Sequence, residues 1–132
     1  MDVLFDGDNQ MPEFEISGTA EMLSNLGKRL IEITEYLFEE GGSKECTYFP
    51  HTLRGLSFSL RNPGNGLLDV VLDNDTLKFI GNKVALDKLG NSLINFFDED
   101  TKAKDHFHLD YYEGNMMLNP TNYSLIFMCN NQ

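Results

Sequence analysis

Two segments of this chain repeat one another. Phe14–Ile33 and Leu77–Phe96 align without gaps at a separation of 63 positions. Six of the twenty aligned pairs are identical: Gly18/Gly81, Leu23/Leu86, Leu26/Leu89, Gly27/Gly90, Leu30/Leu93 and Ile31/Ile94. A recurring strand, glycine and amphipathic run is typical of a structural unit that occurs twice. The chain is therefore expected to contain an internal repeat, at 13–72 and 76–129.

Length and composition indicate one folded domain over residues 1–132. The chain has 132 residues, of which 41% are hydrophobic, which is enough to bury a core. It contains no apolar run long enough to cross a bilayer, and its acidic first residues do not resemble a secretory signal. Cys46 and Cys129 are interpreted as buried thiols of a cytoplasmic protein.

The first repeat predicts a strand, a helix and two further strands. After a lead-in at Met1–Pro12, expected to be loosely held, Phe14 and Ile16 alternate with acidic residues as in a strand. Thr19 is placed to cap a helix. The helix is expected to bury one apolar stripe and to end at Glu39–Gly42; the stripe is Leu23, Leu26, Leu30, Ile33 and Leu37. The predicted strands that follow are Leu56–Arg61 and Leu67–Leu72.

The second repeat predicts the same order of elements. Thr76–Ile80 is a strand, and the helix after it ends near Asp98–Asp100; its apolar stripe is Leu86, Leu89, Leu93 and Phe96. His106–Tyr112 and Ser124–Cys129 are strands, and Phe107 and Leu109 align with Phe58 and Leu60.

These duplicated β-α-β-β units predict an α+β fold, in which one mostly antiparallel sheet of about six strands carries both helices on one face. Gly27 and Gly90 fall mid-helix, where glycine costs about 1 kcal/mol relative to alanine. A close approach of each helix to the sheet or to the other helix would explain them.

The charge narrows the class of partner. Twenty-one acidic and ten basic residues give a formal net charge of −11. Such a chain repels nucleic acid and anionic membrane surfaces, because both are bound through Lys and Arg. It attracts basic proteins and associates with them quickly at low salt. The alternative is that acidity only keeps the protein soluble.

One local pattern could bind a metal. In a strand, His106, His108 and Asp110 share a face, opposite Phe107 and Leu109. Two imidazoles and a carboxylate are zinc ligands, although three ligands on one flat strand reach poorly around a tetrahedron. The alternative is the solvated face of a half-buried strand.

No catalytic motif is recognisable. The sequence has no nucleophile elbow, no phosphate-binding loop ending in GK[ST] and no HExxH segment. Glu39–Glu40 and Asp98–Asp100 are acid clusters at predicted helix ends, where solvated carboxylates are typical. No cofactor is expected, and the chain is not expected to be an enzyme.

The segment after this strand favours protein binding. Tyr111 and Tyr112 stand beside Asp110 and Glu113, and tyrosine provides contact area at low entropic cost. The residues Met116–Leu118 that follow could be exposed thioethers that adapt to a partner, or could fold back onto the core.

The second repeat resembles immunity protein family thirty-two of bacterial polymorphic toxin systems. The resemblance is carried by a strand that ends in glycine, leucines at helical spacing, an H-x-H-x-D-Y segment and a leucine before the closing strand. In this chain they are Gly81, Leu86, Leu89, Leu93, His106, His108, Asp110, Tyr111, Leu118 and Ser124. The resemblance implies a cytosolic antidote that binds a cognate toxin domain and blocks it.

Charge and resemblance together predict an immunity protein that neutralises a toxin, with a basic nuclease as one hypothesis for the toxin. The predicted partner-binding residues are Asp98, Glu99, Asp100, His106, His108, Asp110, Tyr111, Tyr112 and Glu113. Two alternatives remain: a small metal-dependent enzyme that uses His106, His108 and Asp110, and a structural or regulatory homodimer that pairs through an open sheet edge.

Overall fold

The computed structural model describes residues 1–6, 12–42 and 51–130, and these contain two helices and nine strands. The first half holds β1 (Asp2–Asp6), β2 (Glu13–Gly18), α1 (Ala20–Ile31), β3 (Tyr36–Glu40), β4 (His51–Thr52) and β5 (Gly55–Leu60). The second half holds β6 (Asp69–Asp73), β7 (Thr76–Gly81), α2 (Lys83–Phe96), β8 (His106–Asp110) and β9 (Ser124–Cys129). Cys46 lies outside the described residues, and the Cys129 thiol is buried.

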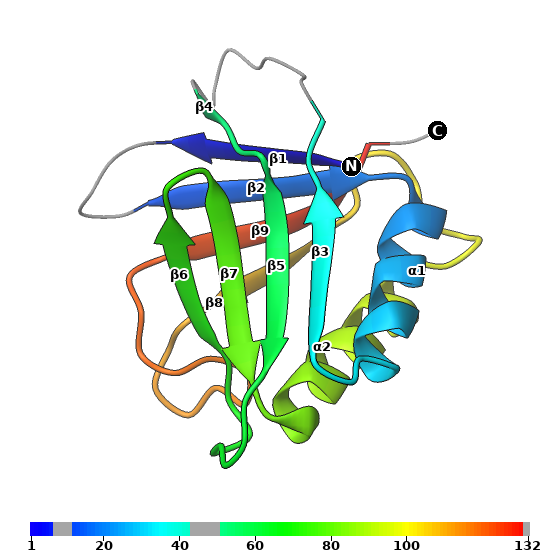
Figure 1. Ribbon diagram of the computed structural model, residues 1–132. Coiled ribbons are helices and arrows are strands. Elements are labelled where there is room, and N and C mark those ends of the chain that lie inside the picture. The colour runs from blue at the N-terminus through cyan, green and yellow to red at the C-terminus, as the bar shows by residue number, and fades with distance from the viewer. Residues whose placement is uncertain (7–11, 43–50, 131–132) are drawn as a thin grey trace.

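The strands form two mixed sheets. Sheet A has the order β4-β1-β2-β9-β8, and sheet B has the order β3-β5-β7-β6. Their strands run across one another, with sheet B in front of sheet A (Figure 1). The broad α+β prediction is confirmed, but the single, mostly antiparallel sheet of about six strands is wrong. The reason is that β2 pairs in parallel with β9, and β7 in parallel with β5, so strands from distant segments form the centre of each sheet.

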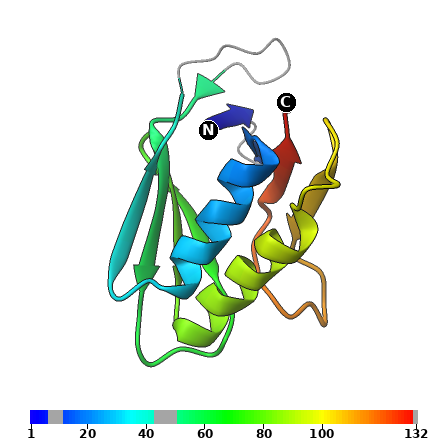
Figure 2. The same ribbon diagram turned by 90° about the vertical axis from the view of Figure 1, so that its right-hand side faces the viewer.

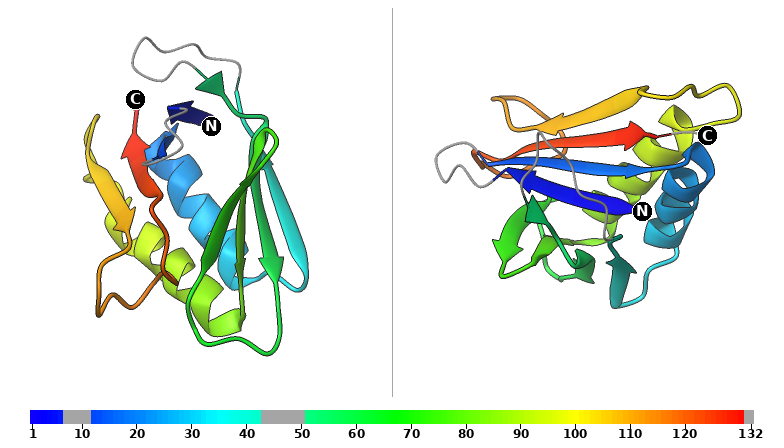
Figure 3. Two further views of the ribbon diagram at one scale, coloured as in Figure 1. Left: turned by 90° about the vertical axis from the view of Figure 1, so that its left-hand side faces the viewer. Right: turned by 90° about the horizontal axis from the view of Figure 1, so that it is seen from above.

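The helices do not cover one face of one sheet, so that part of the prediction is also wrong. α1 and α2 lie side by side in the space between the two sheets and close it along one side (Figure 2). Viewed from the opposite side, the helices lie behind the gap between the sheets (Figure 3). The outer face of each sheet is therefore left without a helix.

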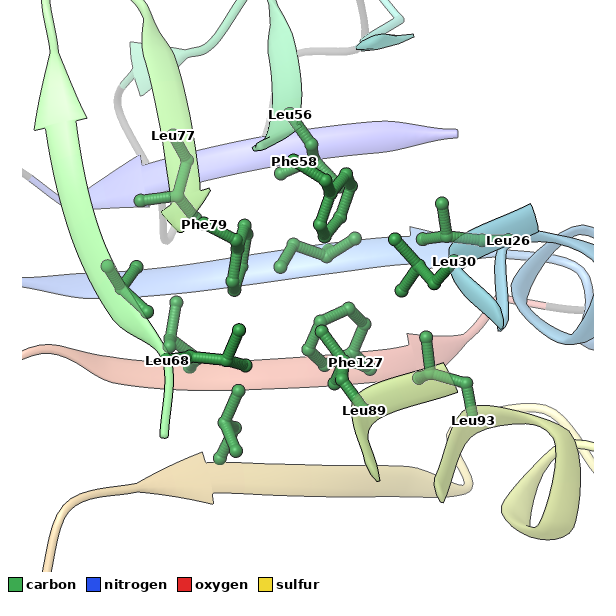
Figure 4. Close-up of a cluster of buried hydrophobic side chains, with 14 of the residues drawn as sticks. Leu26, Leu30, Leu56, Phe58, Leu68, Leu77, Phe79, Leu89, Leu93 and Phe127 are labelled. Atoms are coloured by element: carbon green, nitrogen blue, oxygen red, sulfur yellow. The ribbon is translucent and has the colours of Figure 1, made fainter. Parts of the chain in front are cut away.

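The core fills the space between the two sheets and the helices. Leucines of α1 and α2 point toward phenylalanines of β5, β7 and β9 (Figure 4). Leu26, Leu30, Leu89, Leu93, Phe58, Phe79 and Phe127 are completely buried. Phe58 and Phe79 are stacked with ring centroids 4.9 Å apart across the parallel β5–β7 pair. Because two sheets contribute inward-facing side chains, the leucines of both helices are covered. Phe96, the last residue of the predicted second stripe, is 40% exposed, so the prediction that it is buried is wrong.

The first helix begins as predicted and ends earlier than predicted. The hydroxyl of Thr19 accepts a hydrogen bond from the Met22 N–H at 3.1 Å and caps the helix. The helix ends at Ile31, and the expected last turn is strand β3, in which Leu37 pairs with Phe58 of β5. Leu37 satisfies both the helical stripe and the strand alternation, so periodicity alone could not separate the two. Arg29 of the helix binds Glu39 of the strand at 2.8 Å.

The amino-terminal segment also differs from its prediction. Asp2–Asp6 is strand β1, antiparallel to β2, and not a loosely held lead-in. Val3 is buried and Phe5 stacks on Phe14 at 4.9 Å, so these two side chains share the core face of the strand, whereas the register places Asp2, Leu4 and Asp6 on the other face. The segment DVLFD closely matches DVVLD of β6, and each strand precedes and pairs with the strand that leads into a helix.

The registers of the two sheets correspond. β1 and β6 lie against β2 and β7, and β5 and β9 are the parallel partners of β7 and β2. β3 and β8 flank β5 and β9. HFHLD therefore corresponds to Tyr36–Glu40, and its alignment with Phe58 and Leu60 is wrong. The division of the chain into repeats at 13–72 and 76–129 within one domain stays a prediction. The matching registers relate β1–β5 to β6–β9, and so group β6 with the second unit, whereas the predicted bounds place it in the first.

The two mid-helix glycines meet at the crossing of α1 and α2. A Cβ atom on Gly27 would lie 2.5 Å from the Gly90 carbonyl oxygen, and one on Gly90 would lie 2.6 Å from the Gly27 carbonyl oxygen. The predicted close approach is confirmed, and it is between the helices. Neither described helix is long and apolar enough to cross a membrane.

We predict that Gly27→Ala and Gly90→Ala each lower the free energy of unfolding by about 1–3 kcal/mol, because the methyl group overpacks the crossing. Intrinsic helix propensity acts in the opposite direction by about 1 kcal/mol. Urea unfolding measures the difference. Asn91→Ala, at an exposed position of α2, is the control and should leave the stability unchanged or slightly raised. A Gly27→Ala protein as stable as the parent would contradict the close approach.

Candidate functional site

Strand β8 presents polar side chains on one face and apolar side chains on the other. His106 and His108 are exposed, whereas Leu109 is buried and Phe107 packs against the core. The two imidazole rings lie edge to face with centroids 4.8 Å apart. β8 is the edge strand of sheet A, so these side chains stand at the border of its outer face.

Asp110 has a structural role at this edge. Its Oδ1 accepts hydrogen bonds from the Ser124 hydroxyl at 2.9 Å and from the Leu125 N–H at 3.3 Å. Its Oδ2 lies 3.8 Å from Nδ1 of His108. The carboxylate therefore ties the end of β8 to the start of β9, and only one of its oxygens faces a histidine.

The metal-site interpretation gains no support from this geometry. In the part of the chain that the structure describes, no group of three or more His, Cys, Asp or Glu side chains is arranged to hold a metal ion. Nδ1 of His106 lies 3.0 Å from the Lys104 carbonyl oxygen, and Oδ1 of Asp110 is engaged by β9. Two neighbouring imidazoles on a flat strand leave most of a tetrahedron without protein ligands.

The segment after β8 is organised around Asn115. Its side-chain amide donates to the carbonyl oxygens of Tyr112 at 2.8 Å and Leu118 at 3.2 Å. Its side-chain oxygen accepts from the N–H groups of Met117 at 2.9 Å and Leu118 at 2.7 Å. One side chain therefore closes the whole turn, and Gly114 supplies its positive φ of 89°.

This turn is also attached to the rest of the molecule. Lys88 of α2 donates to the Met116 carbonyl oxygen at 3.1 Å, and the Leu68 N–H donates to the Met117 carbonyl oxygen at 2.8 Å. Leu118 is completely buried and Met117 packs against the core, so these two fold back, as one of the two sequence alternatives expected. Met116 is 68% exposed, as the other alternative expected.

The tyrosines lie at the surface. Tyr112 is 66% exposed, Tyr111 is 38% exposed, and Glu113 is exposed between them and the turn. A hollow of about 230 Å³ opens beside Tyr112; it is lined by Phe107, His108, Leu109, Asp110, Tyr112, Asn115 and Met117. Four of the predicted partner-binding residues, His108, Asp110, Tyr111 and Tyr112, thus lie in or next to one small depression.

The acid cluster after α2 lies elsewhere. Oδ1 of Asp98 accepts from the Asp100 N–H at 2.8 Å, and the Asp98 N–H donates to the Thr101 hydroxyl at 2.8 Å. Asp98 and Glu99 line a different groove of about 490 Å³, formed with the first turns of α1. Asp98–Asp100 therefore close a turn and are not brought into the β8 depression.

The outer faces of the two sheets differ in charge, a difference that the sequence patterns did not predict. On sheet A, the register places acids from three strands on the outer face: Asp2, Asp6, Glu13, Glu15 and Asp110. None of the side chains that the described strands place on this face is Lys or Arg. On sheet B, acids face cations: Asp69 with Arg61 at 3.7 Å, Asp73 with Lys78 at 2.7 Å and Asp75 with Arg54 at 3.9 Å. The alternation of Glu13 and Glu15 with apolar residues along β2 was the available sequence signal.

Comparison with known proteins adds one finding. Residues 76–130 match the family model of immunity protein 32. This confirms the resemblance to that family for the segment from β7 to β9, which includes the β8 depression. No curated protein and no solved structure matches the chain.

Asn115 provides a test of how this turn is held. We predict that Asn115→Asp lowers the free energy of unfolding by about 1–3 kcal/mol, because two donated hydrogen bonds become contacts between carboxylate and carbonyl oxygens. Chemical denaturation measures the loss. Asn25→Asp on the exposed surface of α1 makes the same chemical change and should shift stability by no more than about 0.5 kcal/mol. Equal effects at both sites would show that the turn is held by other contacts.

Proposed function

We propose that this chain is an immunity protein that binds a cognate bacterial toxin domain and neutralises it by direct protein–protein contact, without catalysis. The observation that carries the proposal is the match of residues 76–130 to immunity protein 32. The same segment contains the exposed tyrosines and the hollow beside β8. A cytoplasmic location stays a prediction of the sequence.

The negative charge of this chain supports a toxin domain with a basic binding surface. The chain carries a formal charge of −11, and the outer face of sheet A holds acids from three strands without a Lys or Arg on the described strands. A negative surface of this kind accelerates encounter with a positive one. A nuclease has such a surface because it must bind phosphates, so a nuclease toxin is the finer form of the proposal.

Toxin binding is tested with the purified C-terminal domain of a toxin encoded next to this chain. We predict a stable complex whose association rate falls about tenfold between low and physiological salt. Stopped-flow fluorescence measures the rate, and co-expression measures protection of the cell from the toxin domain. Absence of a complex would overturn the proposed function. A complex whose association rate ignores salt would overturn only the basic-partner form.

The alternative function, a metal-dependent enzyme, can be distinguished from an immunity protein by a single zinc-binding experiment. We predict that zinc titrated into the purified protein gives no stoichiometric binding, because Asp110 is engaged by Ser124 and the two imidazoles alone provide too few ligands. Isothermal titration calorimetry makes the measurement. Stoichiometric zinc binding that is lost in His108→Ala, and kept in His51→Ala, would favour the enzyme. The homodimer that pairs through a sheet edge also stays a prediction, which the mass in solution tests.

A further inference from the structure

Resting on the proposed function, we infer that the toxin docks on the end of β8 and the turn that follows it, and inserts an apolar side chain, flanked by Lys or Arg, into the hollow beside Tyr112. This docking surface consists of His108, Asp110, Tyr111, Tyr112, Glu113 and Met116. It excludes Asp98–Asp100, which the sequence had grouped with it.

Exposed apolar side chains are concentrated at this docking surface. Eight large apolar side chains are exposed among the described residues, and three of them lie within residues 111–116: Tyr111, Tyr112 and Met116. The other five are distributed over α1, β3, β6 and α2. Tyrosine dominates the energetics of many interfaces, and methionine adapts its shape to a partner. A concentration of these side chains on one turn marks a contact surface better than single exposed residues do.

The turn is held rigidly although its side chains are exposed. Asn115 makes four hydrogen bonds within the turn, Lys88 holds the Met116 carbonyl oxygen, and Leu118 is completely buried. Tyr112 and Met116 are therefore presented on a backbone that is already ordered. Association then costs less conformational entropy than it would on a flexible loop.

The hollow has the form of a pocket for one anchoring side chain. Its lining includes Phe107, Leu109 and Met117, which are core or core-facing residues, and Tyr112 and Asp110 border it. A volume of about 230 Å³ is below the range of about 300–1,000 Å³ that is usual for small-molecule sites. Interface hot spots are commonly single side chains that fill such a pocket on the partner.

The negative charge of the docking surface indicates which residues of the toxin flank the inserted apolar side chain. From Asp105 to Asn130 the chain contains no Lys and no Arg, whereas Asp110 and Glu113 lie on the docking surface. The nearby ammonium group of Lys88 is directed to the carbonyl oxygens of Gly66 and Met116. The partner surface that complements this arrangement is positive around an apolar centre.

The outer face of sheet B provides a matched comparison. It also exposes apolar side chains, Tyr36 at 59% and Val71 at 45%. Three of its acids, Asp75, Asp69 and Asp73, are in ion pairs with Arg54, Arg61 and Lys78, and Arg54 lies over the Phe38 ring at 5.1 Å. The register places one further acid, Glu40, on this face. That face is close to electrically balanced, so it lacks the charge complementarity that a basic partner requires.

The test compares two double variants in binding to the purified C-terminal domain of the neighbouring toxin. Tyr112→Ala with Met116→Ala should weaken the complex by at least about 30-fold, because hot-spot truncations have effects of this size. Tyr36→Ala with Val71→Ala on sheet B should weaken it by less than about threefold. Both variants should unfold at the denaturant midpoint of the parent, since all four side chains are exposed. Calorimetry or surface plasmon resonance measures the dissociation constants.

A charge reversal tests the positive rim independently. Glu113→Lys should slow association at low salt by about tenfold and lose this effect at high salt, whereas Glu32→Lys at the end of α1 should leave the rate nearly unchanged.

The outcomes separate the two proposals. A parent protein that binds no toxin overturns the proposed function. A parent that binds, with a Tyr112/Met116 variant that binds equally well or a Tyr36/Val71 variant that fails, overturns the docking surface alone. A parent that is dimeric by sedimentation, and monomeric in the Tyr112/Met116 variant, would assign this surface to a second copy of the chain instead.

Discussion

The contact between the backbones of Gly27 and Gly90 is the constraint on which the rest of the architecture depends. It brings α1 and α2 close enough to fit together between two sheets, where a Cβ atom on either glycine would strike the carbonyl oxygen of the other. The leucines on both sides of each glycine then reach phenylalanines of both sheets. A glycine costs helix stability in isolation, and the packing that it permits offsets that cost.

The two halves of the chain also contribute strands to each other's sheets. The strand that leads into each helix pairs in parallel with a strand from the other half of the chain, β2 with β9 and β7 with β5. Neither half completes a sheet alone, so the family match to 76–130 covers a segment whose strands lie in both sheets. The docking surface proposed at β8 is thus supported by β9, which is held in turn by β2 from the first half. Its rigidity depends on the whole chain.

Structural features that depend on residues close together in the sequence were predicted correctly, whereas pairings between distant strands were not. Thr19 as a helix cap, the leucine stripes and the alternation in β8 are set by neighbours a few residues apart, and the structure has all three. The partition into two sheets depends on pairings between distant segments, which periodicity does not encode. Leu37 fitted helix and strand equally well, and the tertiary pairing with Phe58 decided it. At the candidate site, His108, Asp110, Tyr111 and Tyr112 were found from the sequence. The role of Asn115 was not, because one amide that closes a turn has no sequence signature beyond a nearby glycine.

In the proposed complex, a rigid body presents the end of β8 to a basic toxin domain. Amide hydrogen exchange of the free chain and of its complex with the purified toxin domain tests it most directly, because exchange reports which backbone segments a partner covers. We expect slower exchange in the complex for residues 106–117 and unchanged exchange in β3 and β6, at the outer edges of sheet B. Protection confined to β3 and β6, with residues 106–117 exchanging as in the free chain, would contradict it.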